Sequence, residues 1–207
     1  MRAFILFLSL VIGIAAPAYA GPLTVRVVDG AGRGVANAVV TIRAVGNAHR
    51  PMKGGRSYTV VQKNLQFQPF VTVIPVGSSV SFPNFDPTKH HVYSFSAAKP
   101  FELKLFAREQ SRSVRFDKAG VIALGCNIHD AMSAFIMVSD SMWTAISDAK
   151  GFVRFQDVPA TSSTLTVWHP HLRAPGNQLV RPLAAGDASE LVAVRLRPPP
   201  MHDTGGY

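Results

Sequence analysis

The chain has 207 residues, with 21 Lys and Arg, 12 Asp and Glu and a formal net charge of +9. This length suffices for one large domain or two small ones. The single cysteine excludes an intramolecular disulfide. No compact run of Lys and Arg is present, which argues against nucleic acid as a partner. The positive charge instead indicates an acidic partner or a solvated basic surface.

Residues 1–20 have the features of a secretory signal peptide. Arg2 provides the positive start, residues 4–16 are apolar, and Ala18-Tyr19-Ala20 is a cleavage site of small residues. The apolar segment is short for a membrane span, and no other long apolar stretch follows. We therefore predict export, cleavage near Ala20, a mature net charge of +8 once Arg2 is removed, and no transmembrane segment in the mature chain.

Short β segments separated by turns follow along the mature chain. Residues 23–28 alternate between apolar and other residues and pair naturally with residues 35–44 as a hairpin. Residues 46–56 are polar and contain Pro and Gly, which indicates a loop or linker. Further strands are predicted at 58–62, 65–70, 70–76, 79–82, 92–96, 101–106, 113–116, 121–124, 134–138, 152–155, 164–168 and 191–197. We predict an all-β protein of Greek-key sandwich architecture, with a disordered tail at 198–207.

The segment from Cys126 to Met132 contains three metal-donor side chains. Cys126, His129 and Met132 lie within seven residues. A thiolate, an imidazole and a weak thioether are the donors of a blue-copper electron-transfer site, which needs one more histidine. His90 and His91, about 36 residues upstream, are the candidates. Neighbouring strand residues face opposite sides, so only one of them can reach the metal without a bulge.

Each donor also has an ordinary structural interpretation. Cys126 alone would be a small buried hydrophobic residue, His129 a surface residue and Met132 a core residue. A second metal site at His169-Pro170-His171 would favour an oxidase or reductase, and we expect none. His49 and His202 lie in loop or tail segments. The sequence contains no G-x-S-x-G or H-E-x-x-H motif and no phosphate-binding glycine loop, so we predict a protein that is not an enzyme. Asp86 and Asp117 are expected to cap turns.

Residues 67–138 resemble the cupredoxins, the small blue-copper proteins. The segment from Val80 through Asn84 to His90 is similar to the first-histidine region of that family, and residues 116–126 are similar to its approach to the cysteine. The C-x2-H-x2-M spacing from Cys126 is that of amicyanin and is shorter than the plastocyanin loop. The strings HHVYSF, KPFELKLF, FDKAGV and GCNIHDAM resemble the periplasmic cupredoxin-domain proteins of the methylamine utilization or plastocyanin-like type.

This resemblance implies one type 1 copper ion as the cofactor. Its ligands would be His90, Cys126, His129 and Met132, with His91 as the substitute for His90. The family pattern of ligand, one residue and then an apolar residue favours His90. Asn84 and Asn127 are the candidates for hydrogen bonds that hold the ligand loops or reach the cysteine sulfur.

The flanks resemble a carboxypeptidase-regulatory-like β-sandwich. Residues 23–45 and 143–197 carry this likeness, and a cupredoxin domain at 57–139 would be inserted between them. The alternative is two consecutive domains, with residues 23–45 packed as extra strands on the cupredoxin.

The function implied is that of a periplasmic type 1 copper protein that carries single electrons between redox partners. The positive charge favours an acidic redox partner, such as a c-type cytochrome or a dehydrogenase. Electrons would pass through the ring edge of His129, and Lys89, Lys99, Lys104 and Arg108 are candidates for lining the contact. Two alternatives stay open: a copper-binding or delivery module, and a cell-envelope interaction protein on a cupredoxin scaffold without electron-transfer duty.

Overall fold

The computed structural model describes residues 21–44 and 51–198. In these ranges the protein is built from β-strands and one 3-10 turn, η2 (Pro175–Asn177), so the all-β prediction is confirmed. No helix in the described ranges is long and apolar enough to cross a membrane. The predicted signal peptide at 1–20 and residues 199–207 of the predicted tail lie outside the described residues, as do His49 and His202.

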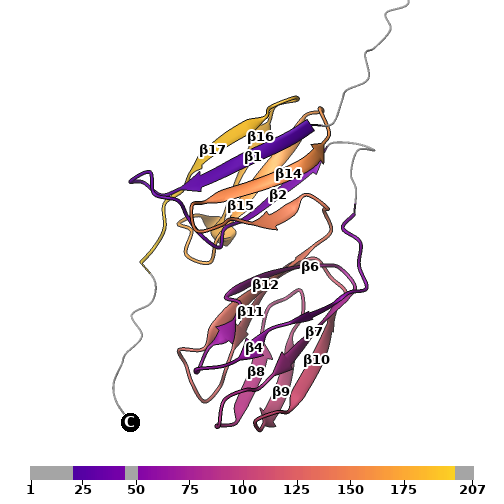
Figure 1. Ribbon diagram of the computed structural model, residues 1–207, viewed down its shortest axis with the longest axis vertical. Helices are drawn as coiled ribbons and strands as arrows, with labels where there is room; N and C mark the ends of the chain where they lie inside the picture. Colours follow the sequence, from indigo (N-terminus) through magenta and orange to yellow (C-terminus); the bar gives the residue numbers. More distant parts are fainter. Residues whose placement is uncertain (1–20, 45–50, 199–207) are drawn as a thin grey trace, which may run out of the picture.

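The two ends of the described chain together form one β-sandwich, here called the flanking sandwich (Figure 1). One sheet has the strand order β14-β1-β17, and the other has the order β13-β2-β15-β16. The strands are β1 (Gly21–Val28), β2 (Val39–Ala44), β13 (Thr144–Ile146), β14 (Phe152–Val158), β15 (Ser163–Trp168), β16 (Gln178–Leu183) and β17 (Ser189–Ala193). Because β2 pairs with β13 and β15, the chain leaves this sandwich after β2 and returns to it at β13.

The segment between β2 and β13 forms the central sandwich (Figure 1). Its larger sheet has the order β6-β12-β11-β8-β9, and its smaller sheet has the order β10-β7-β3. The strands are β3 (Ser57–Thr59), β6 (Val71–Pro75), β7 (Ser78–Pro83), β8 (His90–Ser94), β9 (Phe101–Phe106), β10 (Ser111–Phe116), β11 (Gly120–Gly125) and β12 (Ser133–Ser139). A short hairpin of β4 (Val61–Gln62) and β5 (Phe67–Gln68) lies beside these sheets.

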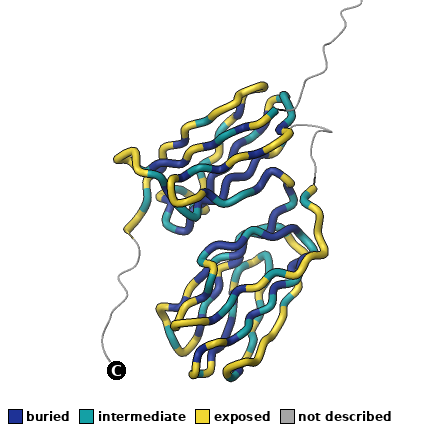
Figure 2. Tube along the Cα trace, in the orientation of Figure 1, coloured by how far each residue is buried: buried dark blue, intermediate teal, exposed yellow. Residues whose placement is uncertain are grey.

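Each sandwich has its own apolar core between its two sheets (Figure 2). In β7, Ser78, Val80 and Phe82 are fully buried, while Ser79 and Ser81 between them are partly exposed. This period of two is what a strand with one buried face requires. Phe82, Phe106 and Phe116 are the largest fully buried side chains of the central core. Of these rings, Phe106 is paired with His90 across β8 and β9, so it lies at the strand end that carries a candidate ligand.

Several segments differ from the sequence prediction. The hairpin predicted from residues 23–28 and 35–44 does not form, because β1 and β2 lie in different sheets of the flanking sandwich, and β13 was not predicted. The strand predicted at 35–44 begins only at Val39, because Asn37 has a left-handed backbone with φ 60° and the preceding residues form a turn. A strand that was not predicted, β16, contains Pro182. Proline cannot donate to a sheet ladder and is confined to edges, and β16 is the edge strand beside β15. This edge position explains why a sequence with an internal proline still forms a strand.

The two sandwiches contact one another through strands that have apolar side chains on both faces. In β12, Ala134 and Ile136 point into the central core, while Phe135 and Met137 pack in a second cluster with Val39 and Trp168 of the flanking sandwich. The rings of Trp168 and Phe135 lie 5.5 Å apart at 63°. We call this second cluster the seam. It explains why these strands are apolar on both faces instead of alternating strictly.

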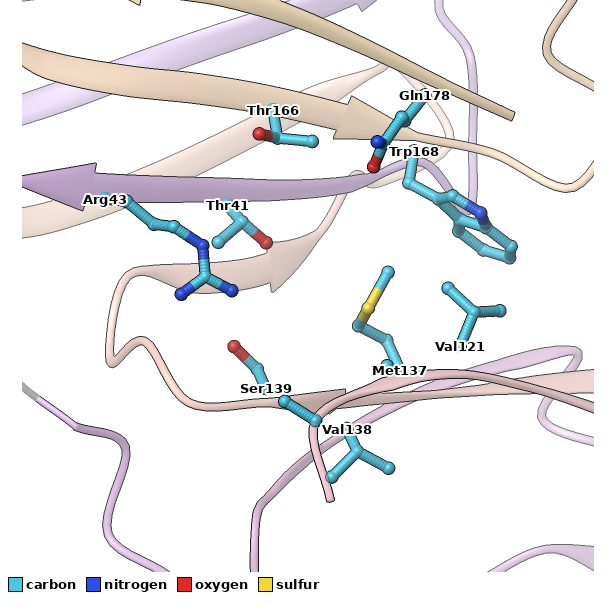
Figure 3. Close-up of a pocket in the computed structure, with 11 residues that line it drawn as sticks. Thr41, Arg43, Val121, Met137, Val138, Ser139, Thr166, Trp168 and Gln178 are labelled. Carbon is cyan, nitrogen blue, oxygen red and sulfur yellow. The ribbon is translucent and has the colours of Figure 1, made fainter. Parts of the chain in front are cut away.

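A hollow of about 350 Å3 lies next to the seam. Figure 3 shows Thr41, Arg43 and Trp168 on one wall and Val121 and Met137 on the other. The hollow contains neither cysteine nor histidine, so it is separate from the candidate metal ligands. The Arg43 guanidinium forms an ion pair of 2.5 Å with Asp140.

Replacing Trp168 by Ala tests whether the seam stabilises the fold. Trp168 is 4% exposed, and the loss of a buried tryptophan typically costs about 3–5 kcal/mol. We expect the free energy of unfolding, measured in urea by fluorescence, to fall by this amount. The single unfolding transition of the wild-type protein should also separate into two. Val180→Ala, at an edge-strand position that is 53% exposed, is the control and should change stability by less than about 0.5 kcal/mol. An unchanged single transition in Trp168→Ala would show that the seam adds little stability.

Candidate metal centre

Pairing between β8 and β11 brings His90 next to Cys126. The strands are antiparallel and meet at Tyr93 and Gly125, so the start of β8 lies beside the end of β11. His90 is the first residue of β8, and Cys126 directly follows β11. A Cβ at position 125 would lie 2.7 Å from the Tyr93 ring, which is why glycine precedes the cysteine. His90 Nδ1 lies 3.8 Å from Cys126 Sγ, and both residues are buried.

His129 completes a group of three donor atoms. Its Nδ1 lies 3.9 Å from Cys126 Sγ, and its ring centroid lies 5.1 Å from that of His90. The ligand loop is tight because Met132 N donates to His129 O at 2.9 Å and β12 begins at the next residue. Met132 is 1% exposed and belongs to the same core cluster as Cys126.

The spacing of these three atoms fits one metal ion. The donor atoms of His90, Cys126 and His129 all lie within 4.8 Å of one another. Metal bonds of about 2.0 Å to nitrogen and about 2.3 Å to sulfur, at an angle of about 120°, place nitrogen and sulfur about 3.7 Å apart. The observed separations of 3.8 and 3.9 Å agree with this value. The donor set of two imidazoles and one thiolate is the trigonal set of a type 1 copper site.

The structure places His90, and not His91, beside the cysteine. The register of β8 and β9 shifts between His90 and Val92, where β9 has one more residue than β8. Despite this bulge the two rings point different ways. His91 Nε2 lies 2.9 Å from a carboxylate oxygen of Glu102 on β9, and its Nδ1 has no hydrogen-bond partner in the described part of the chain.

Asp86 fixes the orientation of the His90 ring. Its Oδ2 lies 2.8 Å from His90 Nε2, and both side chains are buried. An ionised carboxylate can accept hydrogen bonds but cannot donate them, so this contact places the ring proton on Nε2 and directs the Nδ1 lone pair toward Cys126. Burial raises the pKa of the Asp86 carboxyl, but the hydrogen bonds from His90 and two backbone amides outweigh it and lower the pKa below its ordinary value of 3.8.

The sequence prediction for Asp86 is a turn cap within the segment that resembles the first-histidine region, and it does not include this contact. The available signal was its position four residues before His90, between Pro83 and Pro87, in a segment that cannot form regular structure. Carboxylates that hold a metal-binding histidine are common, because they set its tautomer and its basicity. Asp117, the other aspartate expected in a turn, is exposed and accepts a hydrogen bond of 2.7 Å from Arg115 Nε.

The two candidate supporting asparagines differ in their surroundings. Asn84 is fully buried and donates from Nδ2 to Thr88 O at 2.8 Å and to Phe106 O at 3.2 Å. Its Oδ1 accepts the backbone N–H of Asp86 at 2.9 Å. Asn84 therefore ties the loop before His90 to β9. Asn127 is exposed, and the described residues give its side chain no hydrogen bond to the sulfur or to either ligand loop.

His169 and His171 lie at the seam and not at the metal centre. Their ring centroids are 5.5 Å apart, and His171 stacks on Phe70 of the central sandwich at 6.4 Å. Within the described ranges no third ligand-type side chain joins them. Burial lowers the pKa of His169 to about 4, the nearby His171 adds to this shift, and a backbone hydrogen bond with Ala36 opposes it.

The chain matches no protein-family model, and no curated protein sequence matches it. Several solved structures are similar to part of it. A Cu-containing nitrite reductase from Thermus scotoductus SA-01 is 24% identical over 45% of this chain, with a TM-score of 0.40, and the match spans only 26% of the reductase chain.

A purple cupredoxin from Nitrosopumilus maritimus is 20% identical over 40% of this chain and 99% of its own, with a TM-score of 0.36. A Cu(I) form of an amicyanin mutant is 18% identical over 48% of this chain and 98% of its own, with a TM-score of 0.38. These similarities are weak, so the case for a metal centre depends on the geometry of the side chains of this protein.

Replacing each of the two neighbouring histidines separates their roles. We expect His90→Ala to weaken Cu(II) binding by at least about 100-fold, because it removes a donor and not only a support for one. His91→Ala should keep copper binding within about tenfold and instead lower stability by about 1–3 kcal/mol, since it removes a buried side chain. Isothermal titration and urea unfolding of both variants measure these effects. Loss of copper binding in His91→Ala alone would reverse the assignment.

Acid should destabilise the seam through His169. The unfolded histidine has an ordinary pKa of 6.5, whereas the folded value is about 4. Between these values the unfolded chain takes up a proton that the folded chain does not, so stability is complete above pH 6.5 and falls as the pH drops toward 4, by up to roughly 3 kcal/mol. We expect His169→Gln to lack this part of the decline in urea unfolding at pH 7 and pH 4.5. An equal decline in both proteins would assign the effect to other groups.

Proposed function

We propose that this chain is a cupredoxin-type copper protein of the periplasm that carries single electrons between redox partners. The observation that supports this proposal best is the convergence of His90 Nδ1, Cys126 Sγ and His129 Nδ1, at spacings that fit one trigonal metal ion. Met132, buried at the end of the same loop, is the proposed weak fourth ligand. A bound copper ion would supply a one-electron couple between Cu(I) and Cu(II).

The protein residues would keep the donor atoms in one geometry for both oxidation states. Cys126 and His90 lie at the ends of two paired strands, and Asp86 and Asn84 fix the loop in front of His90. Cys126 is 2% exposed and Met132 is 1% exposed, so water has little access to the sulfur donors. Little rearrangement is then needed when the charge of the site changes, which favours fast electron transfer.

His129 is the proposed exit for the electron. It is partly exposed, whereas His90 is fully buried. The neighbouring Ile128 is 47% exposed and provides apolar surface for a partner beside this ring. Lys89 and Arg108 are exposed as well, and we propose that they favour an acidic redox protein, such as a c-type cytochrome or a dehydrogenase, through electrostatic attraction.

The geometry supports electron transfer more directly than the two alternatives. A module for copper delivery or a scaffold for envelope contacts does not require an isolated buried thiol with two imidazoles around it. An enzyme would need a substrate position beside the metal or a further centre, and the described residues form one group of metal ligands. We therefore propose a carrier and not an oxidase or reductase.

A visible absorption titration of the purified mature protein with Cu(II) tests this function. We expect one equivalent to produce an intense thiolate-to-copper band, ascorbate to bleach it and an oxidant to restore it. Cys126→Ala should bind Cu(II) without producing this band, because the absorbing thiolate is gone. The matched control is His171→Ala, which removes a histidine outside the proposed centre and should leave the band unchanged.

Two results would contradict the proposal. One is a colourless wild-type protein that still binds Cu(II), since its thiolate would then not be a ligand. The other is oxidation of Cys126 to a disulfide-linked dimer in place of a reversible colour change. The first result would favour the copper-binding or delivery alternative, and the second would favour the scaffold alternative.

A further inference from the structure

The tip of the β4–β5 hairpin is a two-residue turn in an unfavourable conformation. Lys63 and Gln66 exchange backbone hydrogen bonds of 3.0 and 3.2 Å across it. Between them, Asn64 and Leu65 have φ values of 56° and 54°. Two positive φ values are typical of a type I′ turn, whose second central position favours glycine. Leucine is unfavourable there, and its side chain is 47% exposed, so core packing does not explain the conformation.

The direction of the backbone N–H groups of Asn64 and Leu65 explains this turn conformation. Asn64 N donates to Asp86 Oδ1 at 2.6 Å, and Leu65 N donates to Asp86 Oδ2 at 3.0 Å. Successive N–H groups that converge in this way form a small anion-binding site. The carboxylate that they hold is 5% exposed and also contacts His90 Nε2 at 2.8 Å. One buried carboxylate therefore joins the hairpin tip to a proposed metal ligand.

The hairpin is also fixed at its base. Gln62 forms an isolated bridge with Asn84, and Phe85 N donates to Gln62 O at 2.8 Å. The Gln62 side chain is fully buried and donates from Nε2 to Phe82 O at 3.2 Å. The tip consequently has a defined position relative to Asp86.

We propose that the hairpin tip tunes the copper site by controlling how strongly Asp86 accepts the His90 hydrogen bond. This inference rests on the proposed function. Two amide donors draw electron density from the carboxylate, which weakens its bond to His90. Without them the carboxylate accepts more strongly, His90 becomes a more electron-rich donor, and Cu(II) is favoured over Cu(I). Asn64 and Leu65 are thus positioning residues that act through Asp86.

Two variants with opposite expected effects test the inference in the copper-loaded protein. Proline at 65 has no N–H and cannot adopt a positive φ. We expect Leu65→Pro to shift the Cu(I)/Cu(II) equilibrium about tenfold toward Cu(II), which is a potential about 59 mV lower for a one-electron couple. Asp86→Asn replaces the carboxylate with a weaker, neutral acceptor and should raise the potential. Spectroelectrochemical titration measures both, and general loosening of the site would not give opposite signs.

A double variant shows whether the tip acts through Asp86. In the Asp86→Asn background, the shift caused by Leu65→Pro should become much smaller. Leu65→Gly retains the amide, so it separates loss of the N–H from loss of the side chain. Equal shifts in both backgrounds, shifts of the same sign in the two single variants, or no shift in Leu65→Pro would each overturn the inference.

The metal-free protein provides an independent readout if a variant fails to bind copper. The amides of Asn64 and Leu65 should exchange slowly with solvent although they lie at an exposed tip, and they should lose this protection in Asp86→Asn. Fast exchange in the wild-type protein would overturn the inference without bearing on copper binding. A missing thiolate band together with slow exchange would instead count against the proposed function.

Discussion

The carboxylate of Asp86 holds the His90 ring in one orientation, and the whole donor set depends on that orientation. A free imidazole can present either nitrogen, and a ring turned over would direct an N–H toward Cys126 in place of a lone pair. The 2.8 Å contact with Nε2 removes this ambiguity. The strand pairing then brings the cysteine beside this ring, because the start of β8 and the end of β11 lie next to each other at one end of the larger central sheet. His129 joins them through a loop that returns at once into β12.

The flanking sandwich packs against the sheet that carries the ligands. Strand β12 has Ile136 in the central core and Met137 in the seam, so this part of the sheet that carries the ligands is packed on both faces. Closely packed interiors have low compressibility. The flanking strands come from both ends of the described chain, which closes the central segment between two fixed points, Ala44 and Thr144. A rigid sheet of this kind suits a site whose donor atoms have to stay in place when its charge changes.

Local sequence patterns were sufficient for the all-β class and for one strand, residues 101–106, with the bounds that the structure has. They also located the ligand candidates, because a thiol, an imidazole and a thioether rarely lie so close together without a common role. The contacts that were missed depend on tertiary structure. Asp86 is unremarkable in the sequence and acquires its role only when the loop folds onto the β4–β5 hairpin. Strand β16 contains a proline and forms because it lies at a sheet edge. Asn127 follows the cysteine directly, yet its side chain faces solvent.

X-ray absorption at the copper K edge of the copper-loaded protein would show whether Cys126, His90 and His129 bind one copper ion together, because the fine structure reports the atoms bonded to the metal. We expect one sulfur neighbour at about 2.3 Å or shorter and two imidazole nitrogens at about 2.0 Å, with the sulfur lost in Cys126→Ala. A spectrum with only nitrogen and oxygen neighbours would rule out this site, since the thiol would then not bind the metal.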